Sequence, residues 1–322
     1  MGSGESDRTL SEVGEFEVIE RLTRGRPESA DVAVGPGDDG AVVLAPDGRV
    51  VVSTDMLVED RHFRLDWSTP HDVGRKAMAQ NAADIEAMGG RVTAFVVGFG
   101  APPDTPAAQI EALGDGMWDE AGRLGATIVG GDLVASPHWV VSVTVLGDLA
   151  GRAPVLRSGA RPGSRIAVAG QLGYSAAGYA LWHSGIEQFG EFRQRHLVPQ
   201  PPYGQGRVAA ETGAQAMIDL SDGLVADLRH VAEKSGVGID LSTQALDVDR
   251  GLLLSAADVA GIDAWTWVFG GGEDHALVAA FPGPIPAGWR EIGQVIDGPA
   301  RVLVDGTEWR GYAGWQSFGS VG

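Results

Sequence analysis

The sequence predicts a two-domain protein of mixed class, with an N-terminal α/β domain at residues 1–150 and a C-terminal α+β domain at residues 151–322. Three observations support this prediction. The chain has 322 residues, which is enough for two domains of ordinary size. Strand-like and helix-like segments alternate through its first half. Residues 147–164 are rich in Gly, Pro and Arg, a composition typical of a domain boundary.

Composition excludes several classes of function. The net charge of −19 argues against nucleic acid and anionic membranes as partners, because both require a positive surface. Lysine occurs only at positions 76 and 234, so there is no Walker A loop, and cysteine is absent, which removes disulfides and thiolate sites. Because no run of about 18 apolar residues occurs, we expect no membrane span. A cytoplasmic protein is the simplest interpretation.

Residues 34–62 carry the first concentration of acidic side chains. The Val-rich segments 41–44 and 49–54 flank an Ala-Pro-Asp-Gly turn, a pattern that predicts a β-hairpin. Asp38 and Asp39 precede the first predicted strand, and Asp55 closes the second. Since antiparallel pairing places the start of one strand beside the end of the next, these carboxylates should converge, and they would then require a cation.

Residues 35–40 match the dinucleotide fingerprint G-x-G-x-x-G, but the context is wrong for that function. The fingerprint follows a strand and opens a helix, whereas here a strand follows and two Asp would repel a bare phosphate. Mg²⁺ suits such a segment, because it prefers carboxylate oxygen and bridges to substrate phosphates. The alternative is that these Asp are ordinary turn residues beside Gly.

A helix is predicted from Thr69-Pro70 to the Gly pair at 89–90, with Thr as the N-cap. At 100° per residue, Asp84 lies within about 60° of Val73, Ala77 and Asn81, so its carboxylate should face the core and need a partner. The other segments predicted in the first half are a helix at 12–24, a strand at 91–98, a helix at 105–124, and strands at 126–129 and 139–146. Asp132 is expected to end the strand 126–129.

The second half repeats the pattern of acidic residues at element ends. We expect a strand at 165–169, a helix at 174–183, and a strand from 216 that runs into Ser221 as the N-cap of a helix reaching about 235. Asp219 and Asp222 flank that cap. They either favour the positive helix end alone or form, with the hydroxyl and the helix N-terminus, a phosphate and metal site.

Three consecutive glycines at 270–272 precede Glu273 and Asp274. We expect the glycines to follow a strand, and residues 276–281 to form another. Consecutive glycines permit close approach of a ligand to the backbone, although a flexible turn would explain them equally well.

Taken together, these segments resemble the thiamine-monophosphate kinases, which belong to the superfamily of aminoimidazole ribonucleotide synthetase and selenophosphate synthetase. Single motifs are weak, but their joint order is specific and covers nearly the whole chain. The matching segments are Gly-Asp-Asp-Gly-Ala at 37–41, Ser-Thr-Asp at 53–55, residues 81–89, Gly-Gly-Asp at 130–132, Arg-Ser-Gly at 157–159, Ile-Asp-Leu-Ser-Asp-Gly at 218–223, Gly-Gly-Gly-Glu-Asp at 270–274 and Gly-Trp at 314–315.

The resemblance implies transfer of the ATP γ-phosphoryl group to thiamine monophosphate with the help of Mg²⁺. Asp55, Asp84 and Asp132 would act in catalysis through the metal. The metal ligands implied by motif match are Asp39, Ser53, Thr54, Asp55, Asp84, Asp132, Asp219 and Asp222. The implied ATP contacts are Gly131, Asp132, Arg157 and Ser221, and the implied substrate contacts are His62, Glu273 and Trp315, with Tyr312 as a competing aromatic residue.

For the fold, the resemblance implies the two-domain aminoimidazole ribonucleotide synthetase-like architecture. Its N-terminal sheet would join that of a second copy in a dimeric β-barrel, so the expected assembly is a homodimer. Two alternatives stay open. One is another ATP-dependent synthetase or kinase of the same superfamily, and the other is a non-catalytic, acidic cation-binding protein.

Overall fold

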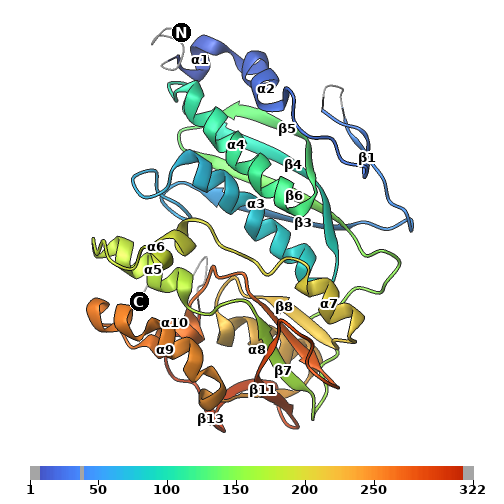
Figure 1. Ribbon diagram of the computed structural model, residues 1–322, viewed down its shortest axis with the longest axis vertical. Helices are drawn as coiled ribbons and strands as arrows, with labels where there is room; N and C mark the ends of the chain where they lie inside the picture. Colours follow the sequence, from blue (N-terminus) through green and yellow to red (C-terminus); the bar gives the residue numbers. More distant parts are fainter. Residues whose placement is uncertain (1–7, 37–39, 315–322) are drawn as a thin grey trace. The chain divides into compact units, whose positions relative to one another are not determined.

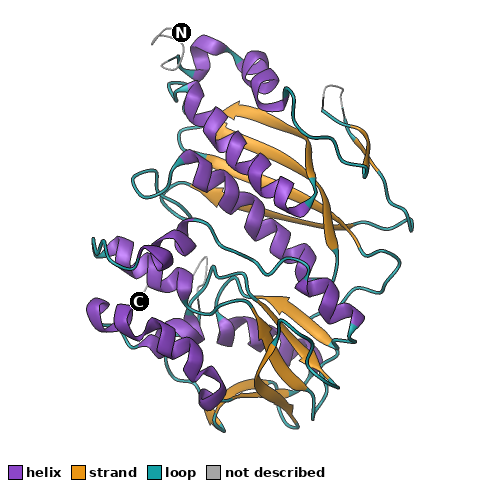
Figure 2. Cartoon of the chain, in the orientation of Figure 1, coloured by secondary structure: helices purple, strands orange, loops and turns teal. Residues whose placement is uncertain are grey.

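The computed structural model describes residues 8–36 and 40–314. The sequence-predicted residues Asp38, Asp39 and Trp315 lie outside these ranges. The chain divides into two compact units, one comprising Met1–Ile85 and Arg91–Gly151, the other Glu86–Gly90 and Arg152–Gly322. Each unit has its own sheet (Figures 1 and 2).

The N-terminal unit is built on a four-stranded sheet with the order β3-β6-β4-β5. Its strands are β3 (Val51–Val58), β4 (Arg91–Ala101), β5 (Thr127–Ala135) and β6 (Val140–Asp148). β6 is antiparallel to β3 and β4, whereas β4 and β5 are parallel. Two short helices, α1 (Leu10–Val13) and α2 (Glu15–Thr23), and a small pair of strands, β1 (Val32–Val34) and β2 (Val42–Val43), precede it.

The predicted hairpin between residues 41–44 and 49–54 is wrong. The turn exists, since Gly48 N donates to Ala45 O, but β2 pairs with β1 and β3 pairs with β6. Eight consecutive residue pairs join β3 to β6, far more than a four-residue hairpin strand could offer. Asp55 therefore lies inside β3 and does not close a strand. Asp132 likewise lies inside β5, which continues to Ala135.

Two long helices, α3 (Pro70–Ala87) and α4 (Ala107–Leu124), cover one face of this sheet (Figure 1). On the covered face Val141, Val143 and Val145 of β6 are completely buried. Because side chains alternate along a strand, the residues between them face the other way. On that second face, Val52 is 63% exposed and Met56 53% exposed. Among the described residues, therefore, the second face of the sheet carries exposed apolar side chains.

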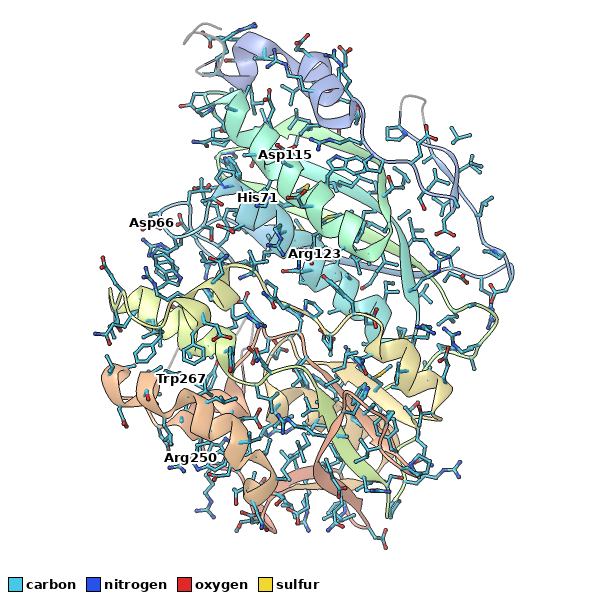
Figure 3. The ribbon with its side chains drawn as sticks, viewed as in Figure 1. Asp66, His71, Asp115, Arg123, Arg250 and Trp267 are labelled. Atoms are coloured by element: carbon cyan, nitrogen blue, oxygen red, sulfur yellow. The ribbon has the colours of Figure 1, made fainter. Side chains whose placement is uncertain are left out.

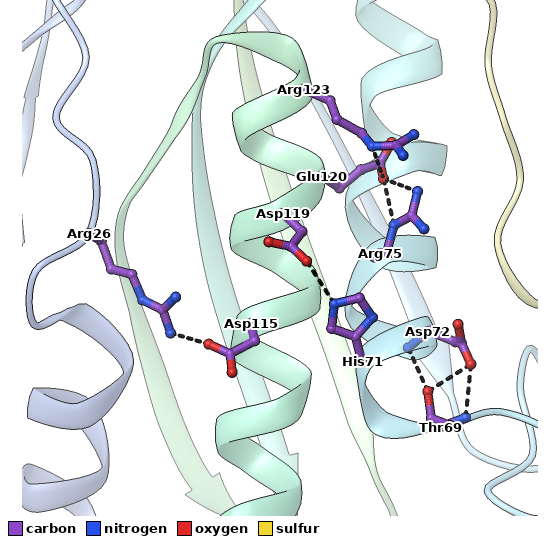
Figure 4. Close-up of polar contacts among 9 residues, drawn as sticks. All are labelled: Arg26, Thr69, His71, Asp72, Arg75, Asp115, Asp119, Glu120 and Arg123. Atoms are coloured by element: carbon purple, nitrogen blue, oxygen red, sulfur yellow. Dashed lines mark hydrogen bonds and ion pairs between the residues drawn. The ribbon is translucent and has the colours of Figure 1, made fainter.

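α3 starts where the sequence predicts, because local signals fix it. Thr69 Oγ1 and the Thr69 N–H both donate to Asp72 Oδ2, and the Asp72 N–H donates back to Thr69 Oγ1 at 3.1 Å. α3 then packs closely on α4, with Arg75 Nε donating to the buried Glu120 carboxylate at 2.9 Å and His71 Nε2 lying 2.9 Å from Asp119 Oδ2 (Figure 4). In Figure 3, the labelled His71 lies on α3 and the labelled Asp115 lies on α4.

The C-terminal unit is built on a seven-stranded sheet of order β13-β12-β9-β11-β7-β10-β8. All neighbours are antiparallel except β12 and β9. The strands are β7 (Arg165–Ala169), β8 (Ala216–Asp219), β9 (Gly238–Leu241), β10 (Leu277–Phe281), β11 (Arg290–Ile296), β12 (Arg301–Val304) and β13 (Thr307–Glu308). The helices are α5 (Tyr174–His183), α6 (Gly190–Leu197), α7 (Gln205–Glu211), α8 (Leu224–Ser235), α9 (Thr243–Ala260) and α10 (Ala264–Gly270).

Both faces of the central strands are buried. Ile166 and Val168 of β7 belong to the larger apolar cluster, together with Trp267 of α10, which is labelled in Figure 3. Ala167 and Ala169 point the other way into a second cluster. Among the described residues, no helix combines the length and apolar character needed to cross a membrane.

Two element predictions in this unit are wrong. Residues 264–270 form the helix α10 and not a strand, and Asp263 caps the start of this helix by accepting from Trp265 N. α8 begins at Leu224 with Gly223 as its N-cap, so Ser221 precedes the cap. Gly223 has φ 136°, a backbone conformation that only Gly adopts easily.

Candidate active site

In the N-terminal unit, β3 and α3 bring three of the predicted site residues together. Ser53 Oγ donates to Asp84 Oδ2 at 2.6 Å, and the Asp55 N–H donates to Asn81 Oδ1 at 2.9 Å. The helical period predicts that the Asp84 side chain faces inward. The Asp84 carboxylate is half-buried and needs a hydrogen-bond partner, which the Ser53 hydroxyl provides.

Asn81 is a residue whose role sequence reasoning missed. It is 1% exposed, and its Nδ2 donates to Ala77 O, which orients Oδ1 toward the β3 backbone at Asp55. The available signal was an amide side chain one turn before Asp84 on the same helix face. A buried amide at that position must bond to something, and the neighbouring strand is the available partner.

Two other predicted ligands of this unit lie apart from that group. Thr54 Oγ1 donates to Val143 O, and its side chain is on the opposite sheet face from Ser53 and Asp55. Asp132 lies on β5, where it is paired with Gly98 of β4, and β5 is the edge strand of the sheet opposite β3. Three strand spacings separate these edges, or about 14 Å. The glycine at 131 is required by packing, since a Cβ there would lie 2.0 Å from Val97 O.

His62 is held at the end of β3. The Val58 N–H donates to His62 Nδ1 at 3.0 Å, so this nitrogen carries no proton, and Lys76 Nζ donates to the His62 carbonyl at 2.9 Å. Lys76 is only 1% exposed. In the neutral imidazole the proton therefore lies on Nε2.

In the C-terminal unit, Asp219 is the last residue of β8, and Asp222 lies on the loop that leads to α8. Asp219 is 4% exposed, and its Oδ2 lies 3.1 Å from His275 Nδ1. The buried Asp227, in the first turn of α8, accepts from the N–H groups of Asp222 and Gly223 through one oxygen, at 3.1 and 3.0 Å. Sequence reasoning missed Asp227, although an acid in the first turn of a predicted helix is a capping signal.

Burial dominates the electrostatics of these carboxylates. Desolvation raises the pKa of Asp227 to about 7, and the neighbouring Asp219 and Asp222 charges add to the rise, against hydrogen bonds from backbone N–H groups that lower it. Desolvation also raises the pKa of Asp222, while the charges of His230 and Arg157 oppose that rise. Because the negative charges of these neighbouring carboxylates repel one another, a bound cation would favour their ionised forms.

Arg157 and Ser221 are exposed on loops of the same unit. The loop of Arg157 is anchored by Ser235 at the end of α8, whose Oγ accepts from Gly159 N and Ala160 N and lies 3.3 Å from Arg157 O. Since the Arg157 charge acts on Asp222, the structure brings this predicted ATP contact near a predicted metal ligand.

The glycine run 270–272 is explained by close packing of the chain on itself. A Cβ on Gly272 would lie 2.6 Å from Ser221 O, and a Cβ on Gly270 would lie 2.4 Å from Tyr312 O. The next residue, Glu273, donates its N–H to Ser221 O at 2.8 Å and has φ 61°. The loop that carries Glu273 is thus packed against the loop that carries Ser221, and Tyr312 lies beside both.

Within the described ranges, no three Asp, Glu or His side chains are arranged to hold a metal ion by themselves. The donor set still fits Mg²⁺. Ser53, Asp55 and Asp84 supply hydroxyl and carboxylate oxygens at one place, and Mg²⁺ commonly takes one or two carboxylates and completes its shell with water and substrate phosphate.

Comparison with known proteins relates this arrangement to one family. The family model "AIR synthase related protein, N-terminal domain" matches residues 37–149. The chain is 73% identical over 311 residues to the thiamine-monophosphate kinase of Mycobacterium tuberculosis, covering 97% of this chain and 93% of that protein. It is 43% identical over 320 residues to the thiamine-monophosphate kinase of Corynebacterium glutamicum, covering 96% and 95%.

Solved structures agree with the sequence comparison. The structure of AaThiL complexed with AMPPCP and TMP superposes with a TM-score of 0.76 at 28% identity, and the match covers 97% of this chain and 99% of that one. The mixed α/β sheets described above are thus an architecture shared along almost the full length. With 73% identity to one such enzyme over nearly all its residues, the chain belongs to the thiamine-monophosphate kinase family.

Proposed function

We propose that this protein transfers the γ-phosphoryl group of ATP to thiamine monophosphate, giving thiamine diphosphate and ADP. The observation that carries the proposal is the 73% identity to a thiamine-monophosphate kinase over 97% of the chain. The similar AaThiL structure is complexed with AMPPCP and TMP, ligands that correspond in kind to the two substrates proposed here.

The chemistry requires positioning more than acid or base catalysis. A phosphate oxygen of thiamine monophosphate attacks the γ-phosphorus, and the bond from that phosphorus to the β,γ-bridging oxygen breaks, so that ADP leaves with the electron pair. The acceptor phosphate is already an anion at neutral pH, so no residue has to remove a proton from it. The residues of this chain act by holding two polyanions in line.

Mg²⁺, when bound, neutralises charge on the phosphates. We propose that several Mg²⁺ ions bind, and that Asp55 and Asp84 hold one of them in the N-terminal unit with Asp39 and Ser53 as further ligands. Thr54 and Asp132, which lie apart from this group, would bind other ions or act through water. Asp219 and Asp222 would bind Mg²⁺ in the C-terminal unit. The Ser53–Asp84 bond and the bond from the Asp55 N–H to Asn81 support the first group, because they join α3 to β3 on the face from which the Asp55 side chain projects.

We propose that Gly131, Asp132, Arg157 and Ser221 contact ATP and that His62 and Glu273 contact thiamine monophosphate. Trp315 or Tyr312 would stack on its heterocycles. The proximity of Arg157 to Asp222 supports a nucleotide phosphate there, since Arg is the forked cation best matched to phosphate.

We further propose that domains at residues 1–150 and 151–322 carry these functions. We propose that the protein is cytoplasmic, as the use of ATP suggests. We also propose that two copies join their N-terminal sheets in a dimeric β-barrel. The exposed apolar side chains on one face of the four-stranded sheet support the dimer, because several such side chains on one face favour an interaction site there.

The direct test is an assay of purified protein with ATP, Mg²⁺ and thiamine monophosphate. We expect thiamine diphosphate and ADP in equal amounts, and no product when the metal is chelated. ATP consumption without thiamine diphosphate would overturn the proposal in favour of another acceptor. Tight Ca²⁺ binding that nucleotide does not affect would favour a non-catalytic cation-binding protein.

The metal has a second test that does not depend on turnover. Adding Mg²⁺ should raise the melting temperature of the wild type, because a ligand that binds only the folded state stabilises it. Asp84→Ala should show a smaller Mg²⁺-dependent rise, since it removes a carboxylate and leaves the Ser53 hydroxyl without that acceptor. Equal rises in both proteins would assign Asp84 a structural role.

A further inference from the structure

A buried histidine lies next to the predicted substrate residue Glu273. His196, on α6, is 7% exposed. Its Nδ1 lies 3.4 Å from Glu273 Oε2 and 3.2 Å from Ser175 Oγ of α5. Its ring also makes an edge contact with Tyr179, with centroids 5.5 Å apart. Three elements therefore meet at this imidazole, and one of them is the loop that carries Glu273.

The same loop is fixed to α5 by the residue that follows. Asp274 Oδ2 accepts from Gly173 N at 2.5 Å, and its Oδ1 accepts from Ser175 N at 2.8 Å. Ser175 thus binds Asp274 through its backbone and lies beside His196 through its hydroxyl. Two hydrogen bonds therefore tie the loop of Glu273 to the start of α5.

Glu273 itself has a backbone conformation that needs such support. Its φ is 61°, in the left-handed region that a side chain with a Cβ adopts at a cost. Residues held in this region persist where their surroundings determine them, and they are common at ligand-binding sites. The direction of the Glu273 side chain is therefore set by its contacts, of which His196 is one.

The contact between His196 and Glu273 favours a proton on Nδ1. An unprotonated Nδ1 would present its lone pair to a carboxylate oxygen 3.4 Å away, which is repulsive. With the proton there, Nδ1 donates toward Glu273 and the Ser175 hydroxyl can turn its own lone pair to the same N–H. The imidazole is then an oriented donor that directs one oxygen of the Glu273 carboxylate.

We propose that His196 is a positioning residue for thiamine monophosphate binding, which holds Glu273 in the orientation that meets the cationic heterocycle of the substrate. This inference rests on the proposed function. His196 acts through Glu273 and contacts neither ATP nor the transferred phosphoryl group. Its loss should therefore weaken binding of thiamine monophosphate and leave the use of ATP unchanged.

Two variants of His196 separate the effect of the N–H at Nδ1 from the effect of ring packing against Tyr179. His196→Phe keeps an aromatic ring against Tyr179 and removes Nδ1, whereas His196→Asn places an amide N–H near the position of Nδ1. We expect His196→Phe to raise KM for thiamine monophosphate about tenfold, the change produced by losing one hydrogen bond to a charged group, with KM for ATP within about twofold. His196→Asn should recover most of the loss.

The matched control is His183→Gln, because His183 stacks on the same Tyr179 but is exposed and takes no part in the proposed role of His196 toward Glu273. It should leave both KM values unchanged. Melting temperatures of all variants establish that each is folded before its kinetics are compared.

A double-mutant cycle with Glu273→Gln decides whether His196 acts through Glu273. We expect His196→Phe to add little to the effect of Glu273→Gln, because the group that it orients is already lost. Equal losses in both backgrounds, or an unchanged KM for thiamine monophosphate in folded His196→Phe, would overturn the inference. A wild type that cannot convert thiamine monophosphate would instead overturn the proposed function.

Discussion

Asp55 is the residue through which the proposed metal site can be tested most directly. Its backbone N–H bonds to Asn81, so replacing the side chain leaves that contact in place. Asp55→Asn conserves volume and removes a charged ligand. Since loss of a residue behind a metal ligand already costs up to about 100-fold, loss of the ligand itself should lower turnover by at least about 100-fold. Turnover and melting temperature are the measurements.

The control for Asp55 is Asp119→Asn, which removes a carboxylate on α4 that pairs with His71 (Figure 4). It should keep turnover within about twofold, because an exposed pair of this kind contributes little. If Asp55→Asn turns over like the wild type, that residue is not part of the site.

Single residues also show what the sequence could and could not predict. The inward orientation of Asp84 followed from the helix period alone, and the structure confirms it with the Ser53 bond. The contacts of Asn81 and His196 depend on strands and helices distant in sequence, so no local pattern contains them. Convergence of Asp38 and Asp39 with Asp55 was argued from a hairpin that does not form.

At the scale of elements, the crossing of α3 and α4 depends on two glycines. A Cβ on Gly74 would lie 2.1 Å from Leu113 O, and one on Gly116 would lie 2.0 Å from His71 O. Gly74→Ala should therefore destabilise the protein by about 1–3 kcal/mol, because the helix backbones must separate. Helix propensity alone predicts the opposite sign. The free energy of unfolding, measured by denaturant titration of the wild type and Gly74→Ala, tests this prediction.

Gly122→Ala, in α4, is the matched control, since a Cβ at that position meets nothing within 4 Å. It should stabilise the protein by about 0.5–1 kcal/mol through helix propensity. A stabilising Gly74→Ala would mean that the two helices are not in backbone contact.

The cap of α5 gives a pH-dependent contribution to stability. Burial raises the pKa of Asp274 to about 7, with the hydrogen bonds from Ser175 and Gly173 opposing the rise. The unfolded carboxyl titrates near about pH 4. Between these values the unfolded chain has lost the proton and the folded chain has kept it, so raising the pH favours unfolding. This contribution is complete below about pH 4 and is lost as the pH rises to about 7.

Asp274→Asn should therefore flatten the dependence of unfolding free energy on pH between about 4 and 7, measured in urea without ATP or Mg²⁺. The variant is less stable overall, because an amide nitrogen cannot accept from Gly173 or Ser175. The difference in slope isolates Asp274, since the other groups titrate in both proteins. Parallel profiles would show that the Asp274 carboxyl is not the group responsible.

Elements with local end signals were predicted well, and pairings between distant strands were not. Thr69 and Pro70 located α3, and the Gly pair at 89–90 located its end. The short apolar run 264–270 suits a strand or a helix equally, and the cap at Asp263 decided for a helix. The pairing of β3 with β6 joins segments about 90 residues apart, so it becomes visible only in three dimensions.

At the scale of the whole molecule, the four-stranded sheet has one face under α3 and α4 and another carrying exposed apolar residues. Val52 and Met56 of β3 and Val134 of β5 are 63%, 53% and 53% exposed, and they alternate with residues of the covered face. Monomeric proteins rarely leave such a surface in water. A second copy of the chain could cover this face with its own matching face, because a two-fold contact uses the same surface on both copies.

A double substitution on this face tests the proposed dimer. The wild type should have the mass of two chains by light scattering after size exclusion, and Val52→Glu/Met56→Glu should have the mass of one, because four carboxylates would be buried across the two-fold contact and would repel one another. The control is Val248→Glu on α9, which is 57% exposed and lies in the other unit, and it should leave the mass of two chains unchanged. A monomeric wild type, or a double variant that stays dimeric while folded, would show that copies do not associate through this sheet.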